Sequence, residues 1–279
     1  MEALQLTASG LTFDAVATGP TDGPLVVLLH GFPQTSWSWR GVWPGLAEAG
    51  YRVVAVDQRG YSPGARPPDV AAYAMPHLVG DVVGVLDALD AERAHLVGHD
   101  WGAAVAWQVA ARHPARLRSL TAVSVPHPRA FVAALRTDPD QRERSTYMRL
   151  FATEGKAEEV LLREDDSGLR TFFGGAEASA DVDTYLNLMH QPGVLTACLN
   201  WYRAQDVGDI ETMPPVTVPT LYVWSDGDRA LGRVAALDTA RHVGGPYRFE
   251  TFPGVSHWVP EEAAAALTAA LLEHLAAHP

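Results

Sequence analysis

The sequence predicts an α/β fold in which helices cover both faces of a mostly parallel sheet. Short, continuous apolar runs of strand length alternate with longer segments of helical spacing. Continuous apolar runs are typical of strands that are buried on both faces, and their alternation with helices implies right-handed crossovers. This alternation stops between residues 127 and 211, which are rich in helical patterns, and then resumes. A helical segment is therefore predicted to be inserted into one α/β domain.

The first half of the chain supplies most of the predicted sheet. Two alternating runs, residues 4–7 and 11–16, flank Ser9 and Gly10 and predict an antiparallel hairpin. Continuous apolar strands are predicted at residues 25–29, 51–56, 94–97 and 117–125. Between them, helices are predicted at residues 37–50, 75–90 and 102–113, the last ended by Pro114.

After the insertion, strands are predicted at residues 219–224 and 247–252, and an alanine-rich helix begins at Glu261. The predicted organisation is therefore a core of residues 1–126 and 212–279, with a helical cap of residues 127–211.

Composition excludes several classes of function. The 279 residues are 47% hydrophobic and carry 21 Lys and Arg against 33 Asp and Glu, a formal net charge of −12. Nucleic acid and anionic membrane surfaces would be repelled, and no basic run offsets this. A single cysteine, Cys198, excludes internal disulfides and multi-cysteine metal sites. We find no signal peptide and no membrane-length apolar stretch, so a cytoplasmic location is expected.

Residues 98–102, Gly-His-Asp-Trp-Gly, lie where a buried strand meets a helix. A G-x-nucleophile-x-G turn in this context exposes its middle side chain above the sheet, and here that residue is Asp100. The alternative is that Asp100 only caps the helix. A second match, residues 60–64, Gly-Tyr-Ser-Pro-Gly, is rejected because Pro63 has no N–H to offer an oxyanion and no helix follows it.

Partners for Asp100 follow other predicted strands. His257 comes after the last strand, and the acid that orients it is expected between nucleophile and histidine in chain order. Asp228 is preferred for this role, with Asp226 as the alternative. The backbone N–H of Phe32, after the first buried strand, and that of Trp101 are predicted to form an oxyanion hole.

An aspartate nucleophile changes the chemistry. A carboxylate is already charged, attacks sp³ carbon and leaves an alkyl ester on the protein. Water activated by a histidine can then hydrolyse that ester at its carbonyl. This scheme needs no metal or organic cofactor.

Residues 30–33 (His-Gly-Phe-Pro), 98–102, the Asp228 loop and residues 254–257 together resemble the epoxide hydrolases of the α/β-hydrolase fold. The resemblance covers nearly the whole chain. It implies conversion of an epoxide to a vicinal diol through an ester on Asp100, and two cap tyrosines that donate hydrogen bonds to the epoxide oxygen.

The tyrosines are assigned from two short matches. Tyr202 lies in Asn-Trp-Tyr-Arg, a close match, and Tyr147 lies in the looser Ser-Thr-Tyr-Met, with Tyr185 as a fallback. Each of them could instead be an aromatic that packs the cap on the core. Ser225 departs from the family, in which glycine is common, so Asp226 stays open beside Asp228 as the acid.

The expected substrate is a small apolar epoxide in a pocket lined by Trp37, Trp39 and Trp101, with water as the second reactant. Haloalkane dehalogenases are similar but typically place Asn at the position of Phe32, and fluoroacetate-type dehalogenases place Arg at that of Trp101. A non-catalytic binding protein of the same fold is the remaining alternative. The sequence indicates no oligomeric state.

Overall fold

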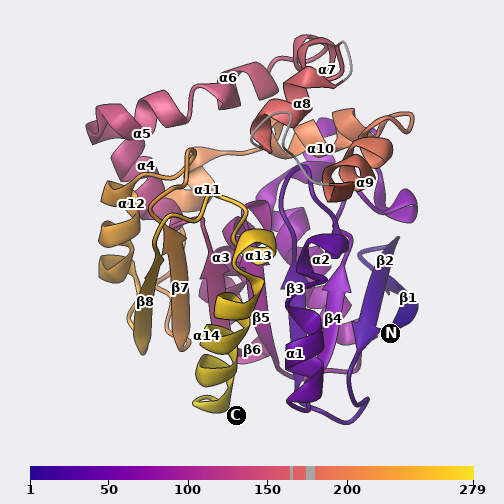
Figure 1. Cartoon of the computed structure of the whole chain (residues 1–279), viewed down its shortest axis with the longest axis vertical. Coiled ribbons are helices and arrows are strands. Elements are labelled where there is room, and N and C mark those ends of the chain that lie inside the picture. The colour runs from indigo at the N-terminus through magenta and orange to yellow at the C-terminus, as the bar shows by residue number, and fades with distance from the viewer. Residues whose placement is uncertain (164–165, 174–179) are drawn as a thin grey trace.

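The computed structural model describes residues 1–163, 166–173 and 180–279. Its eight strands form one sheet in the order β1-β2-β4-β3-β5-β6-β7-β8 (Figure 1). β1 pairs with β2 and β2 with β4 in antiparallel fashion, and all other neighbours are parallel. The strands are β1 (Glu2–Ala8), β2 (Leu11–Thr18), β3 (Leu25–Leu29), β4 (Arg52–Val56), β5 (Ala94–His99), β6 (Leu117–Val123), β7 (Thr220–Ser225) and β8 (Tyr247–Phe252).

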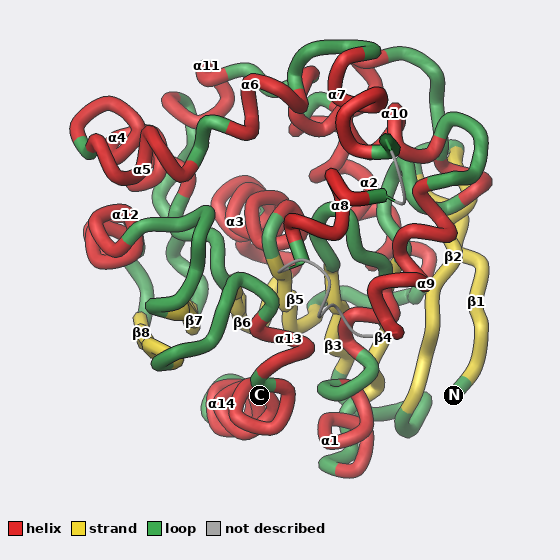
Figure 2. Tube along the Cα trace, turned by 45° about the horizontal axis from the view of Figure 1, so that its top comes forward, coloured by secondary structure: helices red, strands yellow, loops and turns green. Residues whose placement is uncertain are grey.

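The central strands are buried on both faces, as their continuous apolar runs predict. Val27 and Leu29 of β3 pack into one core layer, whereas Val26 and Leu28 pack into the other, because successive side chains of a strand point to opposite faces. Helices α2 (Met75–Ala88) and α3 (Trp101–Arg112) cover the first face. Helices α1 (Trp43–Glu48) and α14 (Ala264–Ala276) cover the second, and Figure 2 shows the strands between these two pairs.

Two predicted helices are broken. Residues 37–50 form a short 3₁₀ turn, Ser36–Trp39, followed by α1, because Pro44 is accommodated only in the first turn of a helix. The last helix likewise begins with a separate turn, α13 (Val259–Glu262), before α14. One further helix, α12 (Arg233–Asp238), belongs to the segment of chain that connects β7 to β8.

Between β6 and β7 the described residues form helices and no strand. These helices lie at the end of the sheet where the parallel strands terminate (Figure 1). They are α4 (Pro128–Thr137), α5 (Pro139–Arg144), α6 (Tyr147–Phe151), α7 (Lys156–Leu161), α8 (Ser167–Phe172), α9 (Ala180–Met189), α10 (Val194–Arg203) and α11 (Val207–Glu211).

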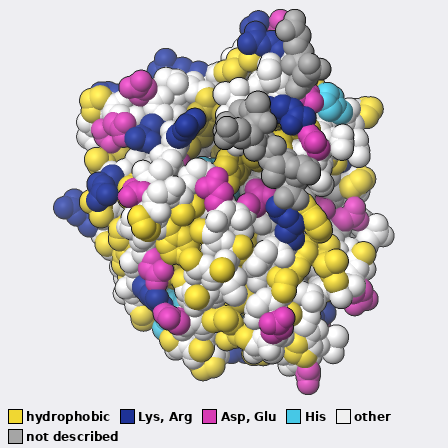
Figure 3. All heavy atoms as spheres, viewed as in Figure 1, with side chains coloured by type: hydrophobic (Ala, Val, Ile, Leu, Met, Phe, Trp, Pro, Cys, Tyr) yellow, Lys and Arg dark blue, Asp and Glu magenta, His cyan; other side chains and the backbone are white. Residues whose placement is uncertain are grey.

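The surface carries charges of both signs. On the face drawn in Figure 3, cationic and anionic side chains are interspersed rather than gathered by sign.

Among the helices that the structure describes, none combines the length and apolar character that crossing a bilayer requires.

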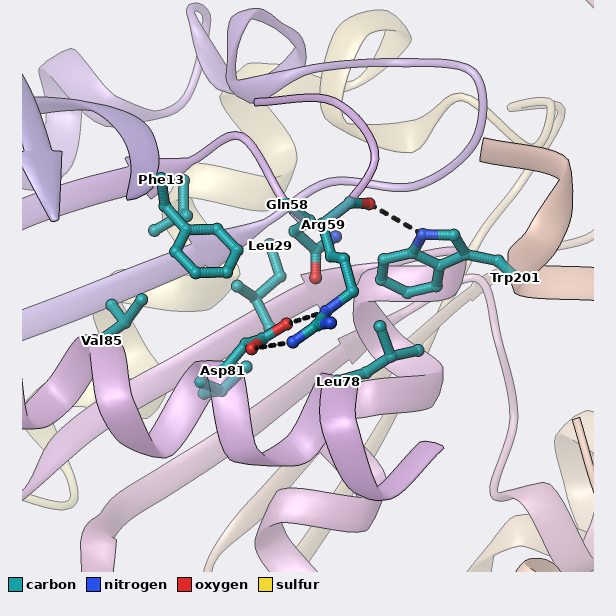
Figure 4. Close-up of a pocket in the computed structure, with 10 residues that line it drawn as sticks. Phe13, Leu29, Gln58, Arg59, Leu78, Asp81, Val85 and Trp201 are labelled. Atoms are coloured by element: carbon teal, nitrogen blue, oxygen red, sulfur yellow. Dashed lines mark hydrogen bonds and ion pairs between the residues drawn. The ribbon is translucent and has the colours of Figure 1, made fainter. Parts of the chain in front are cut away.

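Helix α10 is hydrogen-bonded to a core residue, Arg59, that forms a buried ion pair. The Trp201 indole N–H donates to the Arg59 carbonyl oxygen at 2.9 Å. The Arg59 guanidinium in turn makes two 2.6 Å hydrogen bonds to the Asp81 carboxylate of α2 (Figure 4). A cavity of about 10 Å³ beside this pair has room for about one water molecule. The inserted helix is therefore anchored to a rigid part of the core.

We expect Asp81→Ala to lower the free energy of unfolding by about 3 kcal/mol, because Arg59 would keep a buried charge without a partner. The double variant Arg59→Met/Asp81→Leu should recover much of that loss. The matched control is Glu211→Ala, which removes the exposed Arg136–Glu211 pair and should change stability by less than about 1 kcal/mol. Urea unfolding measures all three, and equal losses for Asp81→Ala and Glu211→Ala would contradict the assignment.

Close backbone approach fixes the start of α3. A Cβ atom on Gly102 would lie 2.2 Å from the Leu29 carbonyl oxygen of β3, and one on Gly98 would lie 2.2 Å from the Gly102 carbonyl oxygen. Glycine alone permits these distances, so the turn between β5 and α3 sits directly on the end of β3.

Gly102→Ala should therefore destabilise the protein by about 2 kcal/mol or more, because the clash is with backbone that cannot move aside. In α2, a Cβ on Gly80 would meet only the Ser9 hydroxyl, at 3.9 Å. Gly80→Ala should instead stabilise by about 0.5–1 kcal/mol, as expected for a helix interior. Thermal unfolding distinguishes the two, and a neutral Gly102→Ala would show that the turn tolerates displacement.

Candidate active site

Asp100 occupies the strained turn between β5 and α3. Its backbone has φ 52° and ψ −122°, a conformation that non-glycine residues rarely adopt. The side chain makes no capping hydrogen bond to α3, so the alternative in which Asp100 only caps the helix does not describe the structure. The turn instead directs the carboxylate toward the loop that follows β3.

The two oxygens of the Asp100 carboxylate face different partners. Oδ1 accepts a hydrogen bond from the Phe32 backbone N–H at 2.8 Å, and the Trp101 backbone N–H lies near enough to help lower the pKa of the carboxyl. These are the two N–H groups predicted for an oxyanion hole. Oδ2 lies 3.4 Å from Nε2 of His257. Gly31 makes the approach possible, since a Cβ there would lie 2.2 Å from the Asp100 Cβ.

His257 lies between two carboxylates. Its Nδ1 is 2.8 Å from Oδ2 of Asp228, while its Nε2 faces Asp100. Asp228 is buried, and its Oδ1 accepts from the backbone N–H groups of Ala230 and Leu231 at 2.7 and 3.0 Å. Asp226 is exposed and accepts from the Gly254 N–H at 2.6 Å. Of the two candidate acids, the structure brings Asp228 to the histidine.

This arrangement shifts both pKa values. Burial lowers the pKa of His257, but the negative charges and hydrogen bonds of Asp228 and Asp100 outweigh it and raise the pKa to about 10. Burial raises the pKa of Asp100, whereas the hydrogen bond and positive charge of His257 lower it, and the net shift is downward. At neutral pH the unreacted site therefore holds an Asp100 carboxylate against a His257 imidazolium.

Side chains that sequence reasoning missed hold the backbone of the histidine loop. The His257 carbonyl oxygen accepts from His99 Nε2 at 2.9 Å and from the Ser124 hydroxyl at 3.0 Å. Burial, together with the positive charge of His257, lowers the pKa of His99 to about 4, so its ring is neutral with the proton on Nε2. Ser225, the departure from the family pattern, donates to the Ser256 carbonyl oxygen at 2.7 Å. It therefore ties the acid loop to the histidine loop.

A cavity of about 220 Å³ opens beside Asp100, and Trp101, Tyr147 and Tyr202 line it. Burial and the negative charge of Asp100 raise the pKa of both phenols well above the usual value, so both hydroxyls keep their protons. The rings of Trp101 and Tyr202 meet edge to face, with their centroids 5.0 Å apart.

Three aromatic residues considered from the sequence lie elsewhere. Trp37 and Trp39 do not line the cavity, which corrects the predicted pocket: the 3₁₀ turn leaves Trp37 38% exposed and buries Trp39 in the core layer under α1. Tyr185, the fallback tyrosine, is buried and donates to Glu261 at 2.9 Å. Nor does Ser62 of the rejected motif line the cavity, because its buried hydroxyl donates to the Asp57 carbonyl oxygen.

The described residues contain no group of three or more His, Cys, Asp or Glu side chains that could hold a metal ion.

Comparison with known proteins gives the family. The family model for the alpha/beta hydrolase fold matches residues 24–264. The AB hydrolase superfamily protein YfhM of Bacillus subtilis is 37% identical over 97% of this chain and 96% of its own. Epoxide hydrolase A of Mycobacterium tuberculosis is 34% identical over 96% of this chain and 95% of its own.

Solved structures agree with these sequence relatives. The crystal structure of epoxide hydrolase A from Mycobacterium thermoresistibile superposes with a TM-score of 0.86 at 30% identity, covering 98% of each chain. A Bacillus megaterium epoxide hydrolase in complex with an inhibitor superposes with a TM-score of 0.88 at 26% identity, covering 98% of this chain and 99% of the other. The chain therefore belongs to the epoxide hydrolases of the α/β-hydrolase fold.

Proposed function

We propose that this protein hydrolyses an epoxide to a vicinal diol through a covalent ester on Asp100. One observation carries the proposal: a single carboxylate has one oxygen on the Phe32 backbone N–H and the other beside an imidazole, in a cavity that two phenols also line. Family membership supports the same reaction. Residues 127–211, which carry both tyrosines, act in this proposal as the cap.

In the first step Oδ2 of Asp100 attacks a ring carbon, because the N–H of Phe32 holds Oδ1. The new C–O bond forms as the ring C–O bond breaks, and the oxygen that is released takes a proton from Tyr202 or Tyr147. No group is expelled, since the oxygen stays attached to the neighbouring carbon.

In the second step the ester is hydrolysed at Cγ of Asp100. Alkylation removes the negative charge beside Nε2, so the pKa of His257 falls and the imidazolium loses its proton, which restores the phenol. Neutral Nε2 then accepts a proton from water as hydroxide adds to Cγ. The negative charge that develops on Oδ1 meets the Phe32 and Trp101 N–H groups. Collapse breaks the ester bond, the leaving alkoxide takes the proton from His257 to give the diol, and the regenerated Asp100 carboxyl then returns its proton to Nε2.

Halide displacement is the nearest alternative. A halide would need side-chain N–H donors, and Phe32 has none. The lack of this donor and the two phenols in the cavity favour an oxygen leaving group. A binding protein without activity is disfavoured because nucleophile, base and acid are in mutual contact.

The test is trapping of the ester in His257→Gln. Alkylation needs Asp100 and a phenol, whereas hydrolysis needs the imidazole, so this variant should accumulate adduct and turn over slowly. Intact-protein mass spectrometry should find the mass of the enzyme plus the whole epoxide, and proteolysis should map the adduct to the peptide that contains Asp100.

Two controls make the trap decisive. Asp100→Ala should form no adduct, and an adduct on any other residue would remove Asp100 from the mechanism. A bromoalkane adduct would be lighter than the sum of its parts by hydrogen bromide. Efficient alkylation by bromoalkanes, with none by several epoxides, would replace epoxide with halide as the substrate class.

The pKa shifts predict different pH profiles for the two steps. Alkylation uses the Asp100 carboxylate, whose pKa is lowered, so its rate should be constant through neutral pH. Hydrolysis uses neutral His257, so its rate should rise with pH and level off at the pKa of His257 in the ester. That value lies below the value of about 10 in the free protein, because the Asp100 charge is gone. Single-turnover tryptophan fluorescence separates the steps, and a hydrolysis rate that still rises above pH 10 would contradict the coupling.

A further inference from the structure

The cavity beside Asp100 extends along one face of α3. Asp100, Ala104 and Gln108 all line it, and their spacing of four residues places them in one stripe of the helix. Eight residues of helix rise by about 12 Å, so the cavity continues about that far from the carboxylate. Helix α4 supplies the facing wall. Phe131 and Leu135 lie four residues apart on one face of that helix, and Val132 lies beside them.

Gln108 is a polar residue in the largely apolar lining of this cavity, two helical turns along α3 from Asp100. Its side chain is 1% exposed, and its Oε1 accepts a hydrogen bond from Arg112 Nε at 3.0 Å. This contact fixes the orientation of the amide, because Nε of arginine is only a donor. Nε2 then points away from Arg112 and makes no hydrogen bond within the described part of the chain. Because Nε2 has no partner within the described part of the chain, an acceptor on a ligand would gain a hydrogen bond from it.

The charge of the lining restricts what that acceptor can be. The ionisable acids among the described lining residues are Asp100, Asp206 and Asp209, and no Lys or Arg belongs to the lining. Gln108 itself offers an N–H without a positive charge. A ligand carboxylate would be placed among acidic groups without a cation in the lining, whereas an uncharged carbonyl would not.

We infer that the substrate is an elongated, uncharged epoxide whose remote end carries a carbonyl oxygen that accepts a hydrogen bond from Gln108. This inference rests on the proposed epoxide hydrolysis and names its substrate class. The ring lies at Asp100, and a linear apolar segment follows α3. About 12 Å corresponds to roughly ten covalent bonds, given that three backbone bonds of an extended chain span about 3.5 Å.

The experiment compares kcat/KM for three terminal epoxides of equal length, about ten bonds from the ring to the last heavy atom. One ends in a methyl ketone, one in an alkyl group and one in a carboxylate. The ratio of ketone to alkyl is measured in the wild type and in Gln108→Met, which keeps the volume but loses the N–H. We expect that ratio to be about tenfold higher in the wild type, the factor for one hydrogen bond of about 1.4 kcal/mol.

Two further variants make the result specific. Arg112→Met removes the neighbour of Gln108 but leaves the amide, so the wild-type preference for ketone should persist. Ala104→Leu narrows the passage halfway along, so it should lower kcat/KM for all three long epoxides relative to a three-carbon epoxide. This second variant tests the route along α3 even if Gln108→Met does not fold.

Each of the other possible results of this experiment would contradict a specific part of the inference about the substrate. Equal ketone-to-alkyl ratios in wild type and Gln108→Met would overturn the role of Gln108. A wild type that prefers the carboxylate would overturn the requirement for an uncharged end. Turnover of no epoxide at all would overturn the proposed function and this inference with it, whereas turnover of the three-carbon epoxide alone would overturn only the inference.

Discussion

Contact between the β5–α3 turn and the end of β3 determines where the Asp100 carboxylate lies. Gly102 lies against the Leu29 carbonyl oxygen, and Gly31 lies so close to the aspartate side chain that a Cβ atom at either glycine would overlap its neighbour. With the backbone held at φ 52°, Oδ1 is delivered to the Phe32 N–H and Oδ2 is left facing His257. A displacement of this turn would therefore disturb both halves of the site at once.

The strand order explains how residues far apart in sequence meet at this point. β3, β5, β6, β7 and β8 are consecutive parallel neighbours, so the loops that follow them emerge at one edge of the sheet. Those loops carry Phe32, Asp100, Ser124, Asp228 and His257. Hydrogen bonds between the loops then restrict them further: His99 and Ser124 both donate to the His257 carbonyl oxygen, and Ser225 donates to that of Ser256.

Features that depend on local pattern could be predicted from the sequence, and features that depend on packing between distant segments could not. The apolar run of β3, the alternating pattern of β8 and the elbow at Asp100 are local, and the structure has them where the sequence predicts them. The direction of Trp37 and Trp39 depends on how a 3₁₀ turn meets the core, so the predicted pocket included them wrongly. Gln108 reads as one more position on a buried helix until α4 packs opposite it and leaves a cavity between them.

The high pKa of His257 is compatible with a role as a base because Asp100, one of the two carboxylates that raise it, is the proposed nucleophile. While Asp100 is ionised, its charge and that of Asp228 keep the imidazole protonated, so the histidine cannot deliver hydroxide before an ester exists. A protonated His257 also lowers the pKa of Asp100 and keeps the carboxylate ready to attack. In the proposed mechanism, ester formation cancels one of the two negative charges and releases the imidazole for the second step. Electrostatic coupling across the 3.4 Å contact between His257 and Asp100 would then set the order of the two reactions.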